Sequence, residues 1–247
     1  MPASPLPWLF ATATLCALPL AQAQADGSCR AHSGPVAPIV VELYTSEGCS
    51  SCPPADRWLS TLRGRQDVLA LAFHVTYWDR LGWPDRFGAA AHTTRQQELA
   101  QRAGSRQVYT PQVVVDGADW RRWPALPGPR VAPAAPALKL ERQGDLVVAT
   151  VATVAAAPGA DTRLAGYWAV LEDGHSSRVT AGENRGETLR HDHVVRLYEP
   201  VAAWAASAGA RPSIAVSRGV AEHPRRVVFV VTDARSGRPL QGLALAC

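Results

Sequence analysis

The sequence has 247 residues, of which 47% are hydrophobic, and its formal net charge is +4. The length suffices for one large domain or two small ones, and the hydrophobic fraction is enough for a packed core. The modest charge excludes the dense basic surface typical of nucleic-acid-binding proteins, so we expect no nucleic-acid partner.

The N-terminal segment has the layout of a secretory signal peptide. The first 25 residues contain no Asp, Glu, Lys or Arg, and an apolar run from Trp8 to Leu18 precedes Ala21-Gln22-Ala23. A short apolar run before an A-x-A sequence is typical of signal peptides. We predict a signal peptide over residues 1–23, with cleavage after Ala23 or Ala25, and a periplasmic or secreted protein. An unstructured or membrane-retained N-terminus is the alternative. No later apolar stretch is long enough for a membrane-spanning helix.

The cysteines permit two disulfides once the signal peptide is removed. Cleavage removes Cys16 and leaves Cys29, Cys49, Cys52 and Cys247. An even number of cysteines in an exported protein allows a disulfide framework, here with three possible pairings. The close spacing favours Cys49–Cys52, and Cys29–Cys247 then follows by elimination. Alternatively, Cys29 and Cys247 are both free at the chain ends.

The first half of the chain alternates between strand and helix patterns. Runs rich in β-branched residues predict strands at 38–45, 68–75 and 112–115. Apolar residues at helical spacing predict helices at 55–62 and 92–103. A strand–helix–strand sequence of this length implies a right-handed unit with parallel strands. Asp116-Gly117 predicts a hairpin turn after the third strand.

The second half has a different pattern. Residues 124–136 contain five prolines in thirteen residues, which indicates a linker. Beyond it, short strands are predicted at 138–141, 146–151, 166–171, 193–198 and 226–231. Residues 201–208 are predicted as a short helix or an Ala-rich crossover. Short strands separated by turn residues are typical of an antiparallel β-sandwich.

The motif Cys49-Ser50-Ser51-Cys52 lies between the first strand and the first helix. Unpaired N–H groups and partial positive charge at a helix N-terminus stabilise a thiolate. Cys49 would attack a disulfide and Cys52 would resolve the mixed disulfide. We therefore hypothesise a thiol–disulfide oxidoreductase whose partner is a protein or small molecule carrying a thiol or disulfide.

The run from Glu42 to Asp56 resembles the signature of the DUF1223 family, which are secreted thioredoxin-like proteins of unknown function. Residues 74–79, 109–117 and 182–186 are similar to it too. The resemblance implies an α/β thioredoxin-like domain over 36–123, and the strand pattern of the second half predicts an all-β sandwich-like domain over 137–247. The resemblance places Thr110-Pro111 where thioredoxin-like folds have a cis-proline, so Pro111 would shape the partner-binding edge. It also suggests that Glu42 accepts a proton from the dithiol; the alternative is a solvated or salt-bridged carboxylate at the sheet end.

Two other functions remain open. The protein could be a binding scaffold in which Cys49–Cys52 is a structural disulfide. It could also handle copper: Cys49, Cys52 and His74 could form a three-ligand copper or zinc site, because His74 ends the second strand, where ligands gather in open α/β sheets. The favoured hypothesis uses no metal and no other cofactor. The sequence does not indicate the oligomeric state.

Several other polar and aromatic residues lie in the predicted loops and strand edges. His191 and His193 are expected to be exposed at a strand edge, and Asp79 and Asp85 to cap loops. An aromatic group is predicted either to line a groove beside the dithiol or to pack in the core. It consists of Tyr77, Trp78 and Trp83.

Overall fold

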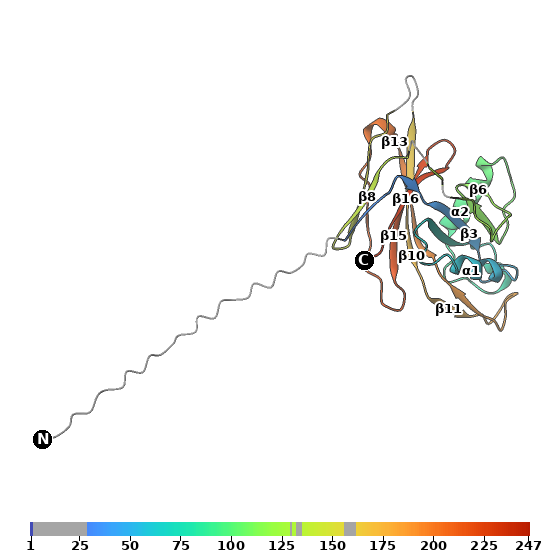
Figure 1. Ribbon diagram of the computed structural model, residues 1–247. Coiled ribbons are helices and arrows are strands. Elements are labelled where there is room, and N and C mark those ends of the chain that lie inside the picture. Colours follow the sequence, from blue (N-terminus) through green and yellow to red (C-terminus); the bar gives the residue numbers. More distant parts are fainter. Residues whose placement is uncertain (2–28, 129, 132–134, 156–161) are drawn as a thin grey trace.

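A computed structural model describes Met1 and residues 29–128, 130–131, 135–155 and 162–247 (Figure 1). The predicted signal peptide, apart from Met1, and part of the predicted 124–136 linker lie outside these ranges. Within the described residues, no helix has both the length and the apolar character needed to cross a membrane.

Eight strands form one large sheet in the order β16-β15-β10-β13-β4-β3-β5-β6. In chain order they are β3 (Ile39–Thr45), β4 (Val68–His74), β5 (Gln112–Val115), β6 (Ala118–Asp119), β10 (Arg163–Glu172), β13 (Val194–Ala205), β15 (Arg225–Asp233) and β16 (Pro239–Leu245). The predicted parallel pair is confirmed, since β3 and β4 run side by side with Leu43 opposite Ala72. Strand β13 also pairs with β4 in parallel, through Val194 and Ala72. Strands from both halves of the chain therefore share one sheet.

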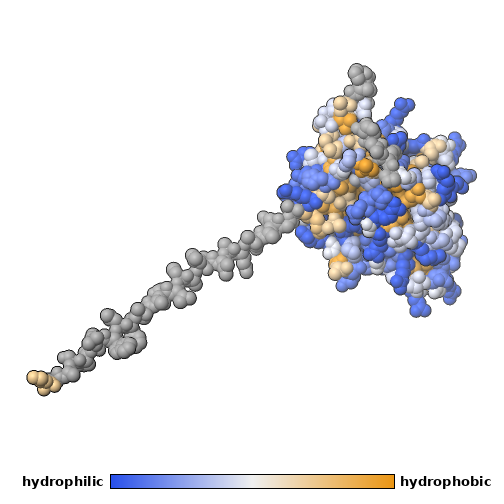
Figure 2. All heavy atoms as spheres, viewed as in Figure 1, coloured by the Kyte–Doolittle hydropathy of each residue, from blue (hydrophilic) through white to orange (hydrophobic). Residues whose placement is uncertain are grey.

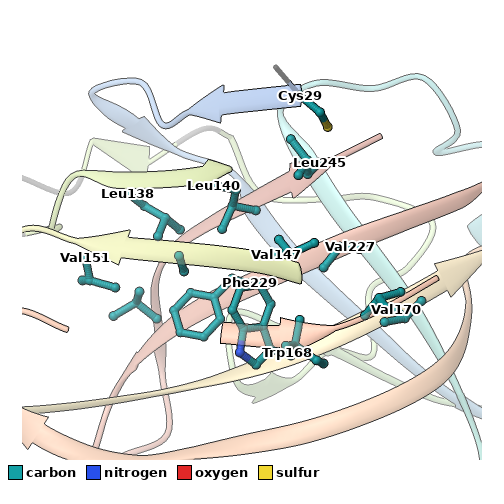
Figure 3. Close-up of a cluster of buried hydrophobic side chains, with 14 of the residues drawn as sticks. Cys29, Leu138, Leu140, Val147, Val151, Trp168, Val170, Val227, Phe229 and Leu245 are labelled. Atoms are coloured by element: carbon teal, nitrogen blue, oxygen red, sulfur yellow. The ribbon is translucent and has the colours of Figure 1, made fainter. Parts of the chain in front are cut away.

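A second sheet has four strands in the order β1-β8-β9-β14. These are β1 (Cys29–His32), β8 (Leu138–Gln143), β9 (Leu146–Val151) and β14 (Ser213–Ala215). Its apolar side chains pack against those of β10, β15 and β16, and Trp168 and Phe229 lie at the centre of this core with ring centroids 4.5 Å apart (Figure 3). Two fully buried rings in contact remove a large apolar area from water, which stabilises the pairing of the sheets.

Two small strand pairs and four helical segments complete the described structure. The pairs are β2 (Val36–Ala37) with β7 (Arg130–Val131), and β11 (His175–Arg178) with β12 (Thr188–His191). The helical segments are α1 (Pro53–Ser60), α2 (Ala90–Arg102) and the 3-10 turns η1 (Asp79–Leu81) and η2 (Ala206–Ala208). On the face seen in Figure 2, hydrophilic side chains surround smaller apolar areas.

Helix α1 begins where the sequence places a proline in its first turn, a position at which no backbone hydrogen bond is lost. Ala55 and Leu59 are buried, and they belong to the same apolar cluster as Val41 and Leu43 of β3. Strand side chains alternate between faces, so Glu42 and Tyr44 point to the opposite face of the sheet. Helix α1 and the buried carboxylate of Glu42 thus lie on different sides of β3.

Both expected disulfides are present. Cys49 is bonded to Cys52, with their Cα atoms 5.4 Å apart, and Cys29 is bonded to Cys247, with Cα atoms 6.1 Å apart. The second bond links β1 to the residues that follow β16. It therefore joins the four-stranded sheet to the large sheet.

The predicted fold class is wrong. An α/β thioredoxin-like domain followed by a separate sandwich was expected, but the described residues contain only two α-helices and are dominated by strands. The described structure is β-sandwich-like, because the four-stranded sheet packs on the large sheet. In the large sheet, β10 and β13 extend the part that β3 and β4 begin. The short helix or crossover predicted for residues 201–208 is wrong for 201–205, where β13 continues to Ala205 by pairing with β10, whereas Ala206–Ala208 form the 3-10 turn η2.

Candidate functional site

The Cys49–Cys52 disulfide lies where β3 passes into α1. Ser46 accepts a hydrogen bond from the Gly48 backbone at 3.1 Å, which forms the turn before Cys49. Cys52 is the N-cap residue of α1, and its carbonyl accepts the Ala55 N–H at 2.9 Å. The disulfide is therefore held at the helix start, as the motif predicts.

Both cysteines are completely buried, whereas Ser50 and Ser51 between them are exposed. The loop 179–187, which joins β11 to β12, contributes to this cover. The side-chain amide of Asn184 donates to the Glu47 carbonyl at 2.8 Å and to the Cys49 carbonyl at 3.0 Å. These two bonds hold the loop, which we call the cover loop, against the backbone of the cysteine turn.

A second contact of the cover loop involves Glu183. Its carboxylate accepts hydrogen bonds from the Ser50 backbone at 3.1 Å and from the Ser50 hydroxyl at 2.8 Å. These two bonds lower the pKa of Glu183. Residues 182–186 resemble the C-terminal half of the DUF1223 family, and in the structure this turn contacts the cysteine motif.

Pro111 lies at the same end of the sheet. It directly precedes β5, whose Gln112 pairs with Tyr44 near the end of β3, and its peptide bond with Thr110 is cis. The indole N–H of Trp78 donates to the Thr110 hydroxyl at 2.8 Å. A side chain at position 48 would meet the Cβ of Trp78 at 3.0 Å, so Gly48 permits a close approach of the cysteine turn to this segment.

Glu42 takes part in a buried charged cluster on the other face of β3. Its carboxylate accepts hydrogen bonds from Arg95 at 3.1 and 2.5 Å, from Tyr44 at 2.7 Å and from Tyr167 at 3.0 Å. Four donors satisfy the buried carboxylate, as a charge removed from water requires. Of the two alternatives, the salt bridge is present, although in a buried position; the proton-accepting role stays a prediction.

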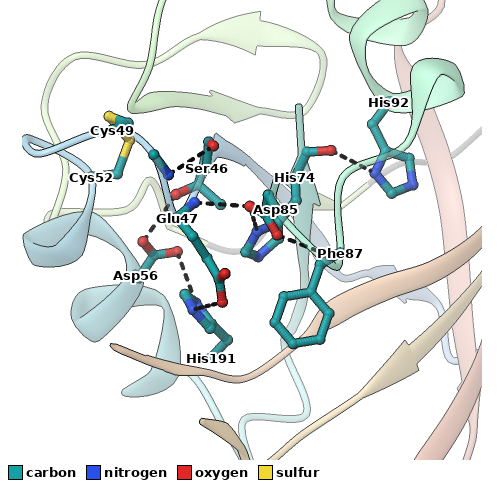
Figure 4. A network of polar contacts seen from close by, with 12 residues as sticks. Ser46, Glu47, Cys49, Cys52, Asp56, His74, Asp85, Phe87, His92 and His191 are labelled. Carbon is teal, nitrogen blue, oxygen red and sulfur yellow. Dashed lines mark hydrogen bonds and ion pairs between the residues drawn. A yellow bond between two sulfur atoms is a disulfide. The ribbon is translucent and has the colours of Figure 1, made fainter. Parts of the chain in front are cut away.

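Beside the cysteine turn, His74 and Asp85 form a fully buried ion pair. The Nδ1 atom of His74 lies 2.7 Å from the Asp85 carboxylate, which also accepts the Glu47 N–H at 2.8 Å and the Phe87 N–H at 2.9 Å (Figure 4). Burial disfavours charge on the imidazole, but the nearby carboxylate raises the pKa of His74 overall. Burial would raise the pKa of Asp85, yet His74 and the backbone donors lower it to about 2.

His191 lies between two further carboxylates. Its Nε2 atom is 3.3 Å from Glu47, and its Nδ1 atom is 4.0 Å from Asp56 (Figure 4). Glu47 also accepts the Trp83 indole N–H at 2.8 Å, and Asp56 accepts the Thr45 hydroxyl at 2.9 Å. Burial raises the pKa of Asp56. Three carboxylates and two imidazoles are thus gathered in the interior beside the disulfide.

Most of this buried cluster was not predicted from the sequence. His191 and His193 were expected to be exposed, but they are only 3% and 2% exposed. Strand β12 packs against α1, and its His191 faces Asp56 of that helix and Glu47 in the turn after β3 rather than water. Asp85 does accept the backbone N–H of Phe87 in its own loop, as expected of a loop cap, yet it also pairs with His74. Asp56 on α1 follows the N-cap residue Cys52 by four residues, a spacing that puts both on one face of the helix.

The aromatic group divides between packing and hydrogen bonding. Trp78 and Trp83 are half-buried and donate to Thr110 and Glu47, as given above. The Tyr77 hydroxyl donates to Gln96 at 3.3 Å. These indoles hold the cysteine turn and the neighbouring loop in place.

Comparisons with known proteins identify relatives but no activity. The model of the family described as "Protein of unknown function (DUF1223)" matches residues 40–232. A crystal structure of a protein from Agrobacterium tumefaciens is 24% identical, covers 87% of this chain and 96% of its own, and has a TM-score of 0.60. HBP35 of Porphyromonas gingivalis is 15% identical, covers 85% of this chain and 75% of its own, and has a TM-score of 0.55. At such identities the likeness concerns the fold alone. No protein with a curated description matches the sequence.

Proposed function

The chain belongs to the DUF1223 family of proteins of unknown function, and we propose that it is an exported thiol–disulfide exchange protein that uses Cys49 and Cys52. The observation that carries the proposal is the disulfide between these residues at the first turn of α1. The unpaired N–H groups of a helix N-terminus stabilise a thiolate there. Two disulfides in one chain are compatible with an oxidising compartment.

The exchange starts from the disulfide form. A thiolate of the partner attacks the Cys49 sulfur, the Cys49–Cys52 bond breaks, and Cys52 leaves as a thiolate at the helix start. A second thiolate of the partner attacks its own sulfur in the mixed disulfide and releases Cys49. Two electrons pass from the partner to the cysteine pair, and the partner gains a disulfide. The reverse sequence reduces a partner disulfide, with Cys49 as the attacking thiolate and Cys52 as the resolving one.

The surroundings of the disulfide define what a partner must do. Because both cysteines are buried, the surrounding structure has to open before attack, and we propose that the cover loop, which is hydrogen-bonded to the cysteine turn, is the part that moves. Pro111, at the neighbouring sheet end, would then border the exposed motif and offer an edge to an extended partner segment. The proposed partner is a protein or small molecule that carries a thiol or disulfide.

The test is the reduction of insulin disulfides by the full chain with dithiothreitol as electron source. Wild-type protein should accelerate precipitation of the insulin B chain, and Cys49→Ser should abolish the acceleration. A double variant that replaces Cys29 and Cys247 by serine is the matched control, because it removes the other disulfide and should retain activity. The proposal is falsified if wild type and Cys49→Ser act alike.

The burial of both sulfur atoms favours one other function, a binding scaffold with a structural disulfide at this position. In that case the bond stabilises the turn between β3 and α1 and does not exchange with partners. Structural disulfides in secreted proteins have reduction potentials below about −300 mV, whereas exchange proteins lie above it. The potential therefore separates the two functions.

A further inference from the structure

Among the described residues, one group of histidine and carboxylate side chains is compact enough to bind a single metal ion. Asp56, His74 and His191 each place one ligand atom within 4.8 Å of the other two. All three residues are buried, with exposed fractions of 7%, 0% and 3%. We propose that these residues form a zinc-binding site.

Unsatisfied nitrogen atoms point to this ligand. The Nε2 atom of His74 and both ring nitrogens of His191 are buried and have no hydrogen-bond partner among the described residues. Buried polar atoms in proteins are almost always paired, so a group of such atoms facing one place requires a partner. The two rings lie close together, with centroids 4.9 Å apart and planes nearly perpendicular. A cation between the rings would satisfy one nitrogen of each.

Each ligand residue is also positioned by a contact to a neighbouring side chain, as in established metal sites. Asp85 binds Nδ1 of His74 at 2.7 Å and so leaves Nε2 as the ligand atom. Glu47 lies 3.3 Å from Nε2 of His191, within ion-pair distance although the contact lacks hydrogen-bond geometry, and this leaves Nδ1, the atom that faces Asp56, for the ion. Thr45 donates to one oxygen of Asp56 at 2.9 Å and leaves the other free to bind.

The charges in this region favour a divalent cation. Glu47, Asp56 and Asp85 bring three carboxylates into the interior, and burying such charges is costly unless they are paired or bind a metal. Two nitrogen ligands and one oxygen ligand suit zinc, with a fourth position left for water or a ligand. Tetrahedral ligands at about 2.0–2.1 Å from zinc lie roughly 3.4 Å apart, so the side chains need to close by ~1 Å on binding.

A pocket connects the site with the surface. It has a volume of about 140 Å³ and lies between the start of α1 and strand β12, and both Asp56 and His191 line it together with Pro53 and Leu189. The pocket provides a route for the ion and room for a bound water molecule. The disulfide does not take part, so this site differs from the predicted copper site of Cys49, Cys52 and His74.

The test uses the full chain with both disulfides formed, stripped of metal with a chelator. Zinc is titrated against a chromophoric chelator, and the bound zinc is counted per chain. Wild type should bind one zinc ion, and His74→Gln or His191→Gln should weaken binding at least about 100-fold. His32→Gln, which changes an exposed histidine of β1, is the matched control and should bind like wild type. Asp85→Asn should weaken binding by about 10–100-fold.

X-ray absorption of the zinc-loaded wild type keeps the proposal testable if a variant fails to fold. Nitrogen and oxygen ligands without sulfur are expected, and sulfur in the first shell would overturn the proposal. So would the absence of stoichiometric zinc binding, or unchanged binding in both histidine variants. Because the protein stays oxidised throughout, these outcomes are independent of the insulin assay, and either proposal can fail without the other.

Discussion

Removal of the Asn184 side chain should accelerate reduction of the Cys49–Cys52 disulfide. Asn184 is 6% exposed, and its amide donates to the carbonyls of Glu47 and Cys49 at 2.8 and 3.0 Å. A hydrogen bond contributes about 1 kcal/mol net, so Asn184→Ala should weaken the closed state of the cover loop by ~2 kcal/mol. If attack requires prior opening, the rate follows the open population. Since 1.4 kcal/mol is a factor of ten, the rate should rise about 30-fold.

The assay is the reduction of the folded protein by dithiothreitol, followed by alkylation and mass spectrometry of each cysteine pair. The Cys29–Cys247 bond in the same sample is the internal control, because the cover loop does not contact it. Glu183→Gln should act in the same direction but more weakly, by a few fold, because the Glu183 carboxylate is exposed and screened. An unchanged rate at Cys49–Cys52, or an equal acceleration at both bonds, would refute the reasoning.

Three further predictions concern stability. Arg95→Met leaves Glu42 as an uncompensated buried charge, which should lower the free energy of unfolding by about 3–5 kcal/mol in urea denaturation; a loss under 1 kcal/mol would contradict this. Burial and the hydrogen bond to Asp119 raise the pKa of Tyr109 to about 12. The contribution of its protonated hydroxyl to the stability of the fold is therefore complete below pH 10 and is lost as pH rises toward 12. The stability difference between wild type and Tyr109→Phe should shrink across that range, and a constant difference would argue against the shift. Replacing Cys29 and Cys247 by serine removes a bond that closes a loop with a sequence separation of 218, so stability should fall by as much as ~5 kcal/mol. Thermal unfolding of the variant against wild type measures this loss. An unchanged midpoint would show that the bond constrains nothing.

Local elements could be predicted from the sequence because their signals are local. The strand at 146–151 was predicted with its observed bounds, and the helix at 92–103 is observed at Ala90–Arg102. The Cys49–Cys52 spacing and the helix start at Pro53 both follow from residues close together in the chain. Such features depend on side-chain period and on where proline fits.

The fold class could not be predicted because it depends on pairing between distant strands. The large sheet is continuous only because β13 adds to β4 at Val194 and Ala72, residues far apart in sequence. Neither strand pattern specifies its neighbour in the sheet. Residues 201–205 show the same effect, since pairing with β10 overrides the helical tendency of the alanines there, and a helical turn forms only at Ala206–Ala208.

Only part of the candidate site could be predicted from the sequence. The cysteines carry a spacing that has a chemical meaning, whereas His191 lies in a short strand whose buried face cannot be assigned without knowing what covers it. The contact of β12 with α1 decides that His191 points inward, toward Glu47 and Asp56. A histidine in a polar strand and an aspartate on a helix gain a shared role only when the chain has folded.

The reduction potential of the Cys49–Cys52 pair decides between an exchange protein and a scaffold. It is measured by equilibrating the full chain in glutathione or dithiothreitol redox buffers and quantifying the two thiols after alkylation. For an exchange protein we expect a value between about −270 and −120 mV, the range of dithiol exchange proteins. A value below about −300 mV would show a structural bond and contradict the proposed exchange.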